Sequence, residues 1–69
     1  MEMKEAFMKL KEGDFGAVKI ESWDDEAYVF ADEDEVLVLH SSIKNSPDVE
    51  YEPDFDDILA DNWIEKKFK

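Results

Sequence analysis

The first stretch of the chain places apolar residues at helical spacing. Met3, Phe7 and Leu10 recur every three or four positions, and mostly lysine and glutamate fill the positions between them. Gly13 follows the last residue of this pattern, and glycine commonly ends a helix in the left-handed conformation. The pattern therefore predicts an amphipathic helix over residues 3–11.

Three short apolar segments follow, each containing β-branched or aromatic residues. They lie at residues 17–23, 28–30 and 36–39. Two acidic breaks separate them, at residues 24–26 and 32–35, and each break is short enough to be a hairpin loop. The simplest arrangement is three antiparallel strands.

A polar segment then interrupts the pattern. Residues 41–53 are rich in serine and contain both prolines of the chain, which is typical of a surface loop. At most a short extended piece is expected around Val49 and Tyr51. A loop of this kind can hold a ligand or a partner.

A second, shorter helix is predicted over residues 55–60. Asp54 can cap its first turn, because a carboxylate before a helix accepts hydrogen bonds from the first backbone N–H groups. Phe55, Ile58 and Leu59 share one face of this helix, and we expect that face to pack against the core.

Residues 62–65 are then expected to return as an edge strand. Together the elements predict a single α+β domain over residues 1–69. It has an N-terminal helix, a small antiparallel sheet of three to four strands and a short C-terminal helix.

The small size of the chain limits its core. A domain of 69 residues buries only about 60% of the surface of its unfolded chain. No cysteine is present, so neither a disulfide nor a thiolate metal site can add stability. We therefore expect a homo-oligomeric interface to supply further burial, with a monomer built on a tight aromatic core as the alternative. No apolar stretch approaches the roughly 18 residues that span a membrane, which favours no membrane contact and a cytoplasmic location.

The charge is strongly negative and unevenly distributed. Twenty Asp and Glu stand against eight Lys, without any Arg, for a formal net charge of −12. Between Ile20 and Asn62 there are fifteen carboxylates and one cation, Lys44. This distribution disfavours direct binding to nucleic acid, which depends on clustered Lys and Arg.

Such a surface attracts basic partners and, if its carboxylates share one face, resembles the charge density of a nucleic acid. A DNA-mimicking inhibitor is therefore one functional interpretation, and a solvated surface that keeps a small protein soluble is the alternative. The candidate protein-binding residues are Glu21, Asp24, Asp25, Glu26, Asp32, Glu33, Asp34, Glu35, Asp54, Asp56 and Asp57.

Catalytic chemistry has few residues to use. The single histidine, His40, ends a predicted strand, where we expect a partly exposed side chain with an ordinary hydrogen bond rather than a general base. With no cysteine and only two glycines, neither a Cys–His pair nor a glycine-rich phosphate loop is available. The acidic run at 32–35 lacks the pattern of a Ca²⁺ loop and is expected to be a turn. We expect no enzyme activity, no metal site and no cofactor.

Three groups of residues resemble one known family. The first helix ends on Leu10-Lys11-Glu12-Gly13, Val18 and Trp23 stand five residues apart, and the chain closes on Asp57-Ile58-Leu59-Ala60-Asp61-Asn62-Trp63. This order is similar to that of the small phage proteins of the Thoeris anti-defense family, second type, formerly a domain of unknown function. Asn62 stands where an acid is usual in the family, and the basic residues usual between the valine and the tryptophan are reduced to Lys19.

The resemblance implies a helix-plus-sheet protomer that forms a small homo-oligomer in the host cytoplasm. It also implies that the protein sequesters a cyclic ADP-ribose-type signalling nucleotide made by a bacterial defence system. By this analogy Trp23 stacks on a base, and Asp61 and Asn62 contact ribose or base edges. Lys19 lines the same pocket.

Two functions therefore stay open from the sequence. One is the sequestration of a cyclic nucleotide through Trp23, Lys19, Asp61 and Asn62, and the other is an acidic nucleic-acid mimic that binds a basic host nuclease or CRISPR effector. A phage protein that keeps the fold without a defence role is the third and simplest interpretation.

Overall fold

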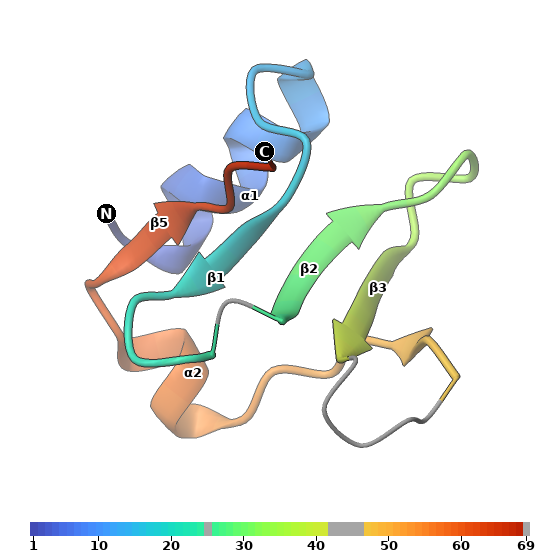
Figure 1. The fold of residues 1–69 in the computed structure, drawn as a ribbon. Coiled ribbons are helices and arrows are strands. Elements are labelled where there is room, and N and C mark those ends of the chain that lie inside the picture. Colours follow the sequence, from blue (N-terminus) through green and yellow to red (C-terminus); the bar gives the residue numbers. More distant parts are fainter. Residues whose placement is uncertain (25, 42–46, 69) are drawn as a thin grey trace.

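The structure, a computed structural model, describes residues 1–24, 26–41 and 47–68 of the chain. The elements in chain order (Figure 1) are helix α1 (Met3–Glu12), strands β1 (Val18–Ile20), β2 (Ala27–Ala31), β3 (Leu37–Ser41) and β4 (Val49–Glu50), helix α2 (Phe55–Leu59) and strand β5 (Trp63–Glu65). The α+β class and the order of helices and strands predicted from the sequence are confirmed.

Helix α1 ends as its sequence predicts. Gly13 adopts the left-handed conformation at φ 83°, and its N–H donates to the carbonyl of Leu10. The N–H of Asp14 reaches back to the carbonyl of Lys9 at 3.0 Å. These two bonds form a Schellman motif, which satisfies carbonyls that the last turn would otherwise leave unpaired.

The sheet contains five antiparallel strands in the order β4-β3-β2-β1-β5, rather than the three to four predicted. The additional strand is β4, at the position where only a short extended piece was expected. Val49 and Glu50 pair with Leu39 and Val38 of β3. This pairing satisfies backbone groups on the outer edge of β3, which explains why two residues in a polar segment become a strand.

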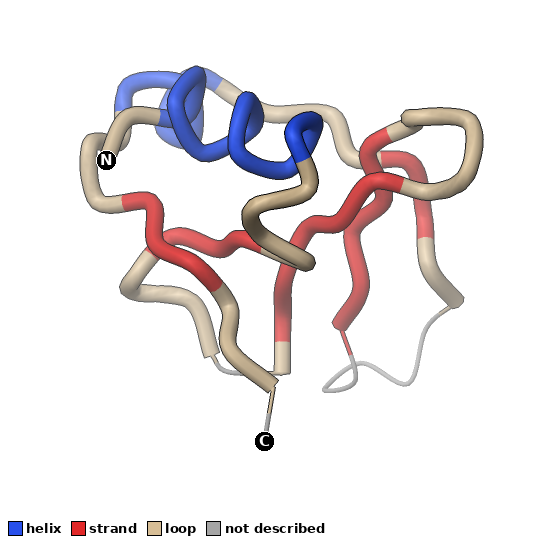
Figure 2. The backbone as a smooth tube through the Cα atoms, turned by 90° about the horizontal axis from the view of Figure 1, so that it is seen from above, coloured by secondary structure: helices blue, strands red, loops and turns tan. Residues whose placement is uncertain are grey.

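The core lies between α1 and one face of the sheet (Figure 2). Val29 of β2 stands opposite both Val18 and Leu39, and Ile20 of β1 stands opposite Trp63 of β5. Directly paired residues point to the same face of a sheet, so these side chains form one apolar layer. Ala6 and Leu10 of α1 pack onto that layer.

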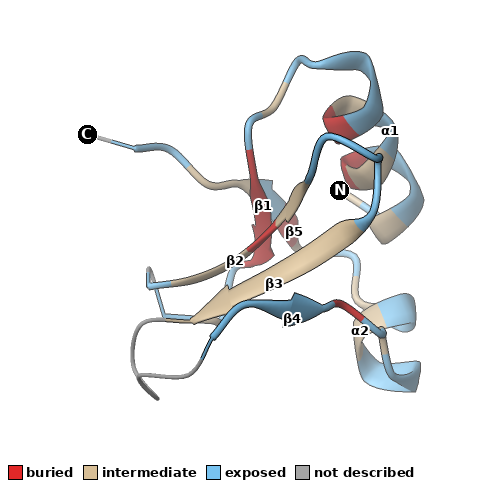
Figure 3. Ribbon diagram, turned by 90° about the vertical axis from the view of Figure 1, so that its right-hand side faces the viewer, coloured by how far each residue is buried: buried red, intermediate tan, exposed pale blue. Residues whose placement is uncertain are grey.

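Helix α2 lies on the same side of the sheet as α1, beyond the end of β4 (Figure 3). The prediction that its apolar residues face the core is wrong. Phe55 is 81% exposed, Leu59 79% and Ile58 46%, and no residue of α2 is buried. The reason is that the opposite side of the helix, which carries Asp57, is the side bonded to the core.

The turn between β2 and β3 is closed by its own acidic residues. Asp32 and Val36 pair through their backbones, and the Asp32 carboxylate accepts the N–H groups of Asp34 and Val36 at 2.9 Å each. Glu35 completes this turn in the left-handed region, at φ 64°. A type I turn followed by a left-handed residue is a frequent three-residue hairpin connection, usually with glycine at that last position.

Glycine at position 35 is therefore expected to stabilise the protein. Left-handed backbone costs an L-residue with a side chain roughly 1–2 kcal/mol, and part of this gain is offset by the greater freedom of glycine in the unfolded chain. We expect Glu35→Gly to raise the free energy of unfolding in urea by about 0.5–1 kcal/mol. Glu35→Ala removes the same charge but keeps the strain, so an equal gain from alanine would contradict this explanation.

Candidate functional site

The four residues proposed to bind a ligand lie on the chain segments where β1 ends and β5 begins, at one end of the sheet. The strands pair there through Ile20 and Trp63, and the N–H of Glu21 donates to the carbonyl of Asn62 at 2.9 Å. Trp23 follows in a turn closed by its N–H and the carbonyl of Ile20. Residues more than forty positions apart in sequence thus become neighbours (Figure 1).

The Trp23 ring is half-buried against the aromatic core. It meets Trp63 edge to face at a centroid distance of 5.4 Å and Tyr51 at 6.2 Å. Trp63 also meets Phe7 at 5.3 Å, so the four rings form one cluster. The cluster holds the Trp23 ring in place, and the part of the ring that remains exposed is available to a ligand.

Lys19 lies on β1 and is only 4% exposed. Its ammonium group donates to the carbonyl oxygen of Trp23 at 2.6 Å. This bond fastens the turn that carries Trp23, because it ties the turn back to the strand before it. An ammonium group has three N–H donors, but Lys19 is almost fully buried, so direct contact with a phosphate requires its side chain to become exposed. Its role as a ligand-binding residue stays a prediction.

Asp61 and Asn62 stand immediately before β5. Asp61 is exposed and Asn62 is half-buried. A carboxylate accepts hydrogen bonds from hydroxyl groups, and an amide both donates and accepts them. These two side chains thus offer the kinds of polar contact that a ribose or a base edge needs, and the carbonyl of Asn62 accepts the N–H of Glu21 at the end of β1.

A hydrogen-bonded network of Tyr51, Trp63 and Asp57 joins α2 to this end of the sheet. The Tyr51 hydroxyl donates to the Asp57 carboxylate at 2.6 Å, and the Trp63 indole N–H donates to the Asp57 carbonyl at 3.1 Å. Burial of the hydroxyl, and then its hydrogen bond to Asp57, raise the pKa of Tyr51 well above its ordinary value. The Tyr51 hydroxyl therefore stays a neutral donor at pH values where an exposed tyrosine begins to lose its proton.

This raised pKa predicts a loss of stability at high pH. Above about pH 10 the unfolded tyrosine loses its proton while the folded one keeps it, so unfolding releases a proton and becomes easier as the pH rises. We expect the free energy of unfolding to fall by up to about 1.4 kcal/mol per pH unit from this residue. In urea titrations between pH 9 and about pH 11, Tyr51→Phe should start less stable but lose less stability than the native protein. Tyr28→Phe leaves the bond to Asp57 in place, and an equal flattening in that variant would contradict the assignment.

The acidic residues proposed for protein binding divide between the two ends of the sheet. Antiparallel connections alternate between ends, so the β2–β3 turn, with residues 32–35, lies about five strand residues or roughly 16 Å from the β1–β2 connection. The described carboxylates of the β1–β2 connection lie at the same end of the sheet as those of α2. Trp23 of the connection packs on Trp63, and the Trp63 indole N–H donates to the Asp57 carbonyl of α2. All described members of the set are exposed except Asp57, which is half-buried, and Asp25 lies outside the described residues.

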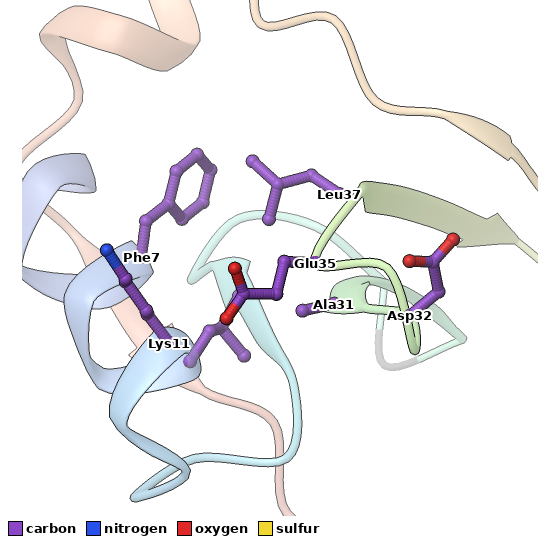
Figure 4. Close-up of a pocket in the computed structure, with 7 residues that line it drawn as sticks. Phe7, Lys11, Ala31, Asp32, Glu35 and Leu37 are labelled. Carbon is purple, nitrogen blue, oxygen red and sulfur yellow. The ribbon is translucent and has the colours of Figure 1, made fainter.

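A pocket of about 470 Å³ lies between α1 and the β2–β3 turn (Figure 4), and shares Phe7 with the aromatic cluster. Its lining combines one ammonium group with two carboxylates over an apolar base, and consists of Phe7, Leu10, Lys11, Ala31, Asp32, Glu35 and Leu37. None of the four proposed ligand-binding residues contributes to it. The Glu35 carboxylate in its lining repels a pyrophosphate, while the Asp32 carboxylate bonds to N–H groups of its own turn.

The histidine behaves as expected. His40 Nδ1 lies 2.7 Å from an oxygen of Asp48, and its ring lies 4.9 Å from that of Tyr28. This is the ordinary hydrogen bond predicted for a strand residue. In residues 1–24, 26–41 and 47–68, no three carboxylate or imidazole groups are arranged to hold a metal ion.

Sequence reasoning missed two features of this end of the molecule. One is the bond between Tyr51 and Asp57, and the other is the solvent-facing apolar side of α2. Apolar spacing identifies a helix face but does not say whether that face points to the core. A tyrosine shortly before an acidic helix is a weak signal for the first feature, and we find no sequence signal for the second.

Comparison of the chain with protein-family models, with curated proteins and with solved structures finds no match. The likeness to the Thoeris anti-defense family therefore depends on the sequence motifs alone. Across the described parts of the chain, the helices are too short and too polar to cross a membrane.

Proposed function

We propose that this chain is a non-enzymatic binding protein that sequesters a cyclic ADP-ribose-type or other cyclic nucleotide signal. The observation that supports this most is the pairing of β1 with β5, which brings the backbone of Asn62 to Glu21, two residues before Trp23, while the Trp23 ring packs on Trp63. Trp23, Asp61 and Asn62 are the residues to which the family resemblance assigns the ligand. The proposal includes the phage origin, the host cytoplasm and the anti-defense role that the resemblance implies.

Each group has a separate task in the proposed complex. The base stacks on the exposed part of Trp23, while the Asp61 carboxylate and the Asn62 amide bond to ribose hydroxyls or base edges. Lys19 keeps the Trp23 turn in place through its 2.6 Å bond to the Trp23 carbonyl. Backbone N–H groups and lysines supply the contacts to the pyrophosphate.

In one protomer Asp61 is exposed and Trp23 and Asn62 are half-buried, so the proposal includes a homo-oligomer. A second protomer placed over the Trp23 end would exclude water from the ligand and strengthen its hydrogen bonds. It would also bring further backbone donors to the phosphates, which the net charge of −12 otherwise repels.

Calorimetric titration of the purified protein with cyclic ADP-ribose isomers and cyclic dinucleotides tests the proposal. A protein that removes a signal must bind it at low concentration, so we expect saturable binding with a Kd of about 1 μM or tighter for one of these probes. Linear ADP-ribose is the matched control, since it has the same groups without the closed ring. Absence of saturable binding with every cyclic probe would contradict the proposal.

A second function is favoured by the arrangement of the acids. Glu21, Asp24 and Glu26 lie at the same end as Asp54 and Asp56, and all five are exposed. This end offers a basic protein a predominantly negative surface, as an inhibitor that mimics nucleic acid would. The salt dependence of binding separates the two functions: affinity for a basic nuclease should fall at least ~10-fold between 50 and 200 mM salt, whereas a stacked nucleotide should be less sensitive.

A further inference from the structure

Helix α2 is amphipathic, but its apolar side faces solvent. Phe55, Ile58 and Leu59 stand at positions i, i+3 and i+4, which lie on one face of a helix. Phe55 and Leu59 are 81% and 79% exposed, more than any other large apolar side chain among the described residues. Asp57 stands on the opposite side of the helix.

The inverted orientation is fixed by bonds to the core. Tyr51 is 7% exposed, Trp63 is fully buried, and both donate hydrogen bonds to Asp57. Asp54 additionally caps the helix by accepting the N–H of Asp57 at 2.9 Å. Turning the apolar side inward would break both bonds from the core and leave two buried donors unpaired, so the helix keeps Phe55 and Leu59 outside.

Exposed apolar residues on a fixed helix, rimmed by charge, have the anatomy of a protein interface. The rim here is acidic, because Glu52, Asp54, Asp56 and Asp61 are all exposed around the helix. Two copies of α2 meeting face to face would bring these carboxylates together, which opposes a symmetric contact. Charge complementarity instead selects a partner with Lys or Arg around an apolar centre.

We propose that α2 is the docking site for a basic amphipathic segment of another protein, with Phe55 and Leu59 as the apolar anchors. This inference depends on the second function proposed above, the binding of a basic protein. It identifies α2 as the part of the protein that gives this binding its specificity. Acidic residues attract many basic surfaces, whereas two apolar anchors in a fixed position select a partner with a matching apolar pair.

The test uses a synthetic helical peptide of lysine and leucine with leucines at i, i+3, i+4 and i+7, and a polylysine peptide of the same charge. Calorimetry of the full chain should show the amphipathic peptide binding at least tenfold more tightly than polylysine, with amide NMR shifts at α2. The double variant Phe55→Ser/Leu59→Ser should lose this tenfold preference. Met8→Ser, which changes a 51%-exposed apolar residue on α1, should keep it.

Both variants change exposed side chains, and circular dichroism should show the same folded state in each. If the native protein bound the two peptides with equal affinity, as the double variant should, the α2 site would be overturned but the acidic binding function would stand. No binding of either peptide would overturn both. If sedimentation showed that the native protein is an oligomer and that the double variant is a monomer, a second copy would cover α2. That result would also overturn the proposal.

Discussion

Replacing Trp63 by alanine is expected to remove a large part of the free energy of unfolding of the protein. Trp63 is fully buried, pairs with Ile20 across β1 and β5, and lies in edge-to-face contact with Phe7 and Trp23. Truncation of a buried tryptophan costs about 3–5 kcal/mol, and a chain of this length has a total stability of roughly 3–10 kcal/mol. The variant also leaves the α2 carbonyl of Asp57 without its indole donor.

Urea denaturation followed by far-ultraviolet circular dichroism measures this effect. Ile64→Ala is the matched control, since Ile64 is the next residue of β5 and is 37% exposed. We expect it to cost about 1 kcal/mol or less. If Trp63→Ala lost no more stability than Ile64→Ala, the aromatic cluster would not be the centre of the core.

Replacing Trp23 by alanine is expected to weaken nucleotide binding by about 5- to 150-fold, which corresponds to the ~1–3 kcal/mol of stacking between a base and an aromatic ring. Trp23→Phe keeps a ring at the same position and should keep most of the affinity. The comparison is made by calorimetry with the cyclic probe that the native protein binds.

Because Trp23 also packs on Trp63 and Tyr51, its removal lowers stability as well. Denaturation curves for each variant therefore accompany the titrations, at a temperature where all variants are folded. Met8→Ala, on the exposed part of α1, is the binding control. A folded Trp23→Ala protein with native affinity would show that the ring serves the core and not the ligand.

The elements that the sequence predicts well are those set by local pattern. Apolar spacing and Gly13 predict α1 to within one residue, and the acidic breaks correctly separate β1, β2 and β3. Strand β4 was only partly foreseen, because Val49 and Glu50 become a strand by pairing with the edge of β3. Pairing between distant segments leaves no periodic signal in a two-residue stretch.

The orientation of α2 shows a second limit. The spacing of Phe55, Ile58 and Leu59 correctly indicates a helix with an apolar face, yet that face points to solvent. The direction of the apolar face depends on the hydrogen bonds that two buried donors, on Tyr51 and Trp63, make to Asp57. A hydrogen bond of this kind is a tertiary event that a local pattern does not encode.

The candidate site was predicted through the resemblance rather than through physical pattern. Nothing in the order of residues places the end of β1 beside Asn62 until β1 and β5 pair. The near-complete burial of Lys19 was also unforeseen, since a lysine in a sequence of many acids is expected at the surface. Its bond to the Trp23 carbonyl explains how the charged group is accommodated there.

Native mass spectrometry tests the central claim most directly. The protein is purified gently from bacteria in which a nucleotide-signalling defence has been triggered, so that one spectrum reports both assembly and bound ligand. Sequestration predicts a homo-oligomer that carries additional mass equal to a cyclic nucleotide, and an empty oligomer from untriggered cells. An empty protein from triggered cells, with a basic nuclease in the same complex, would contradict sequestration and favour the acidic inhibitor.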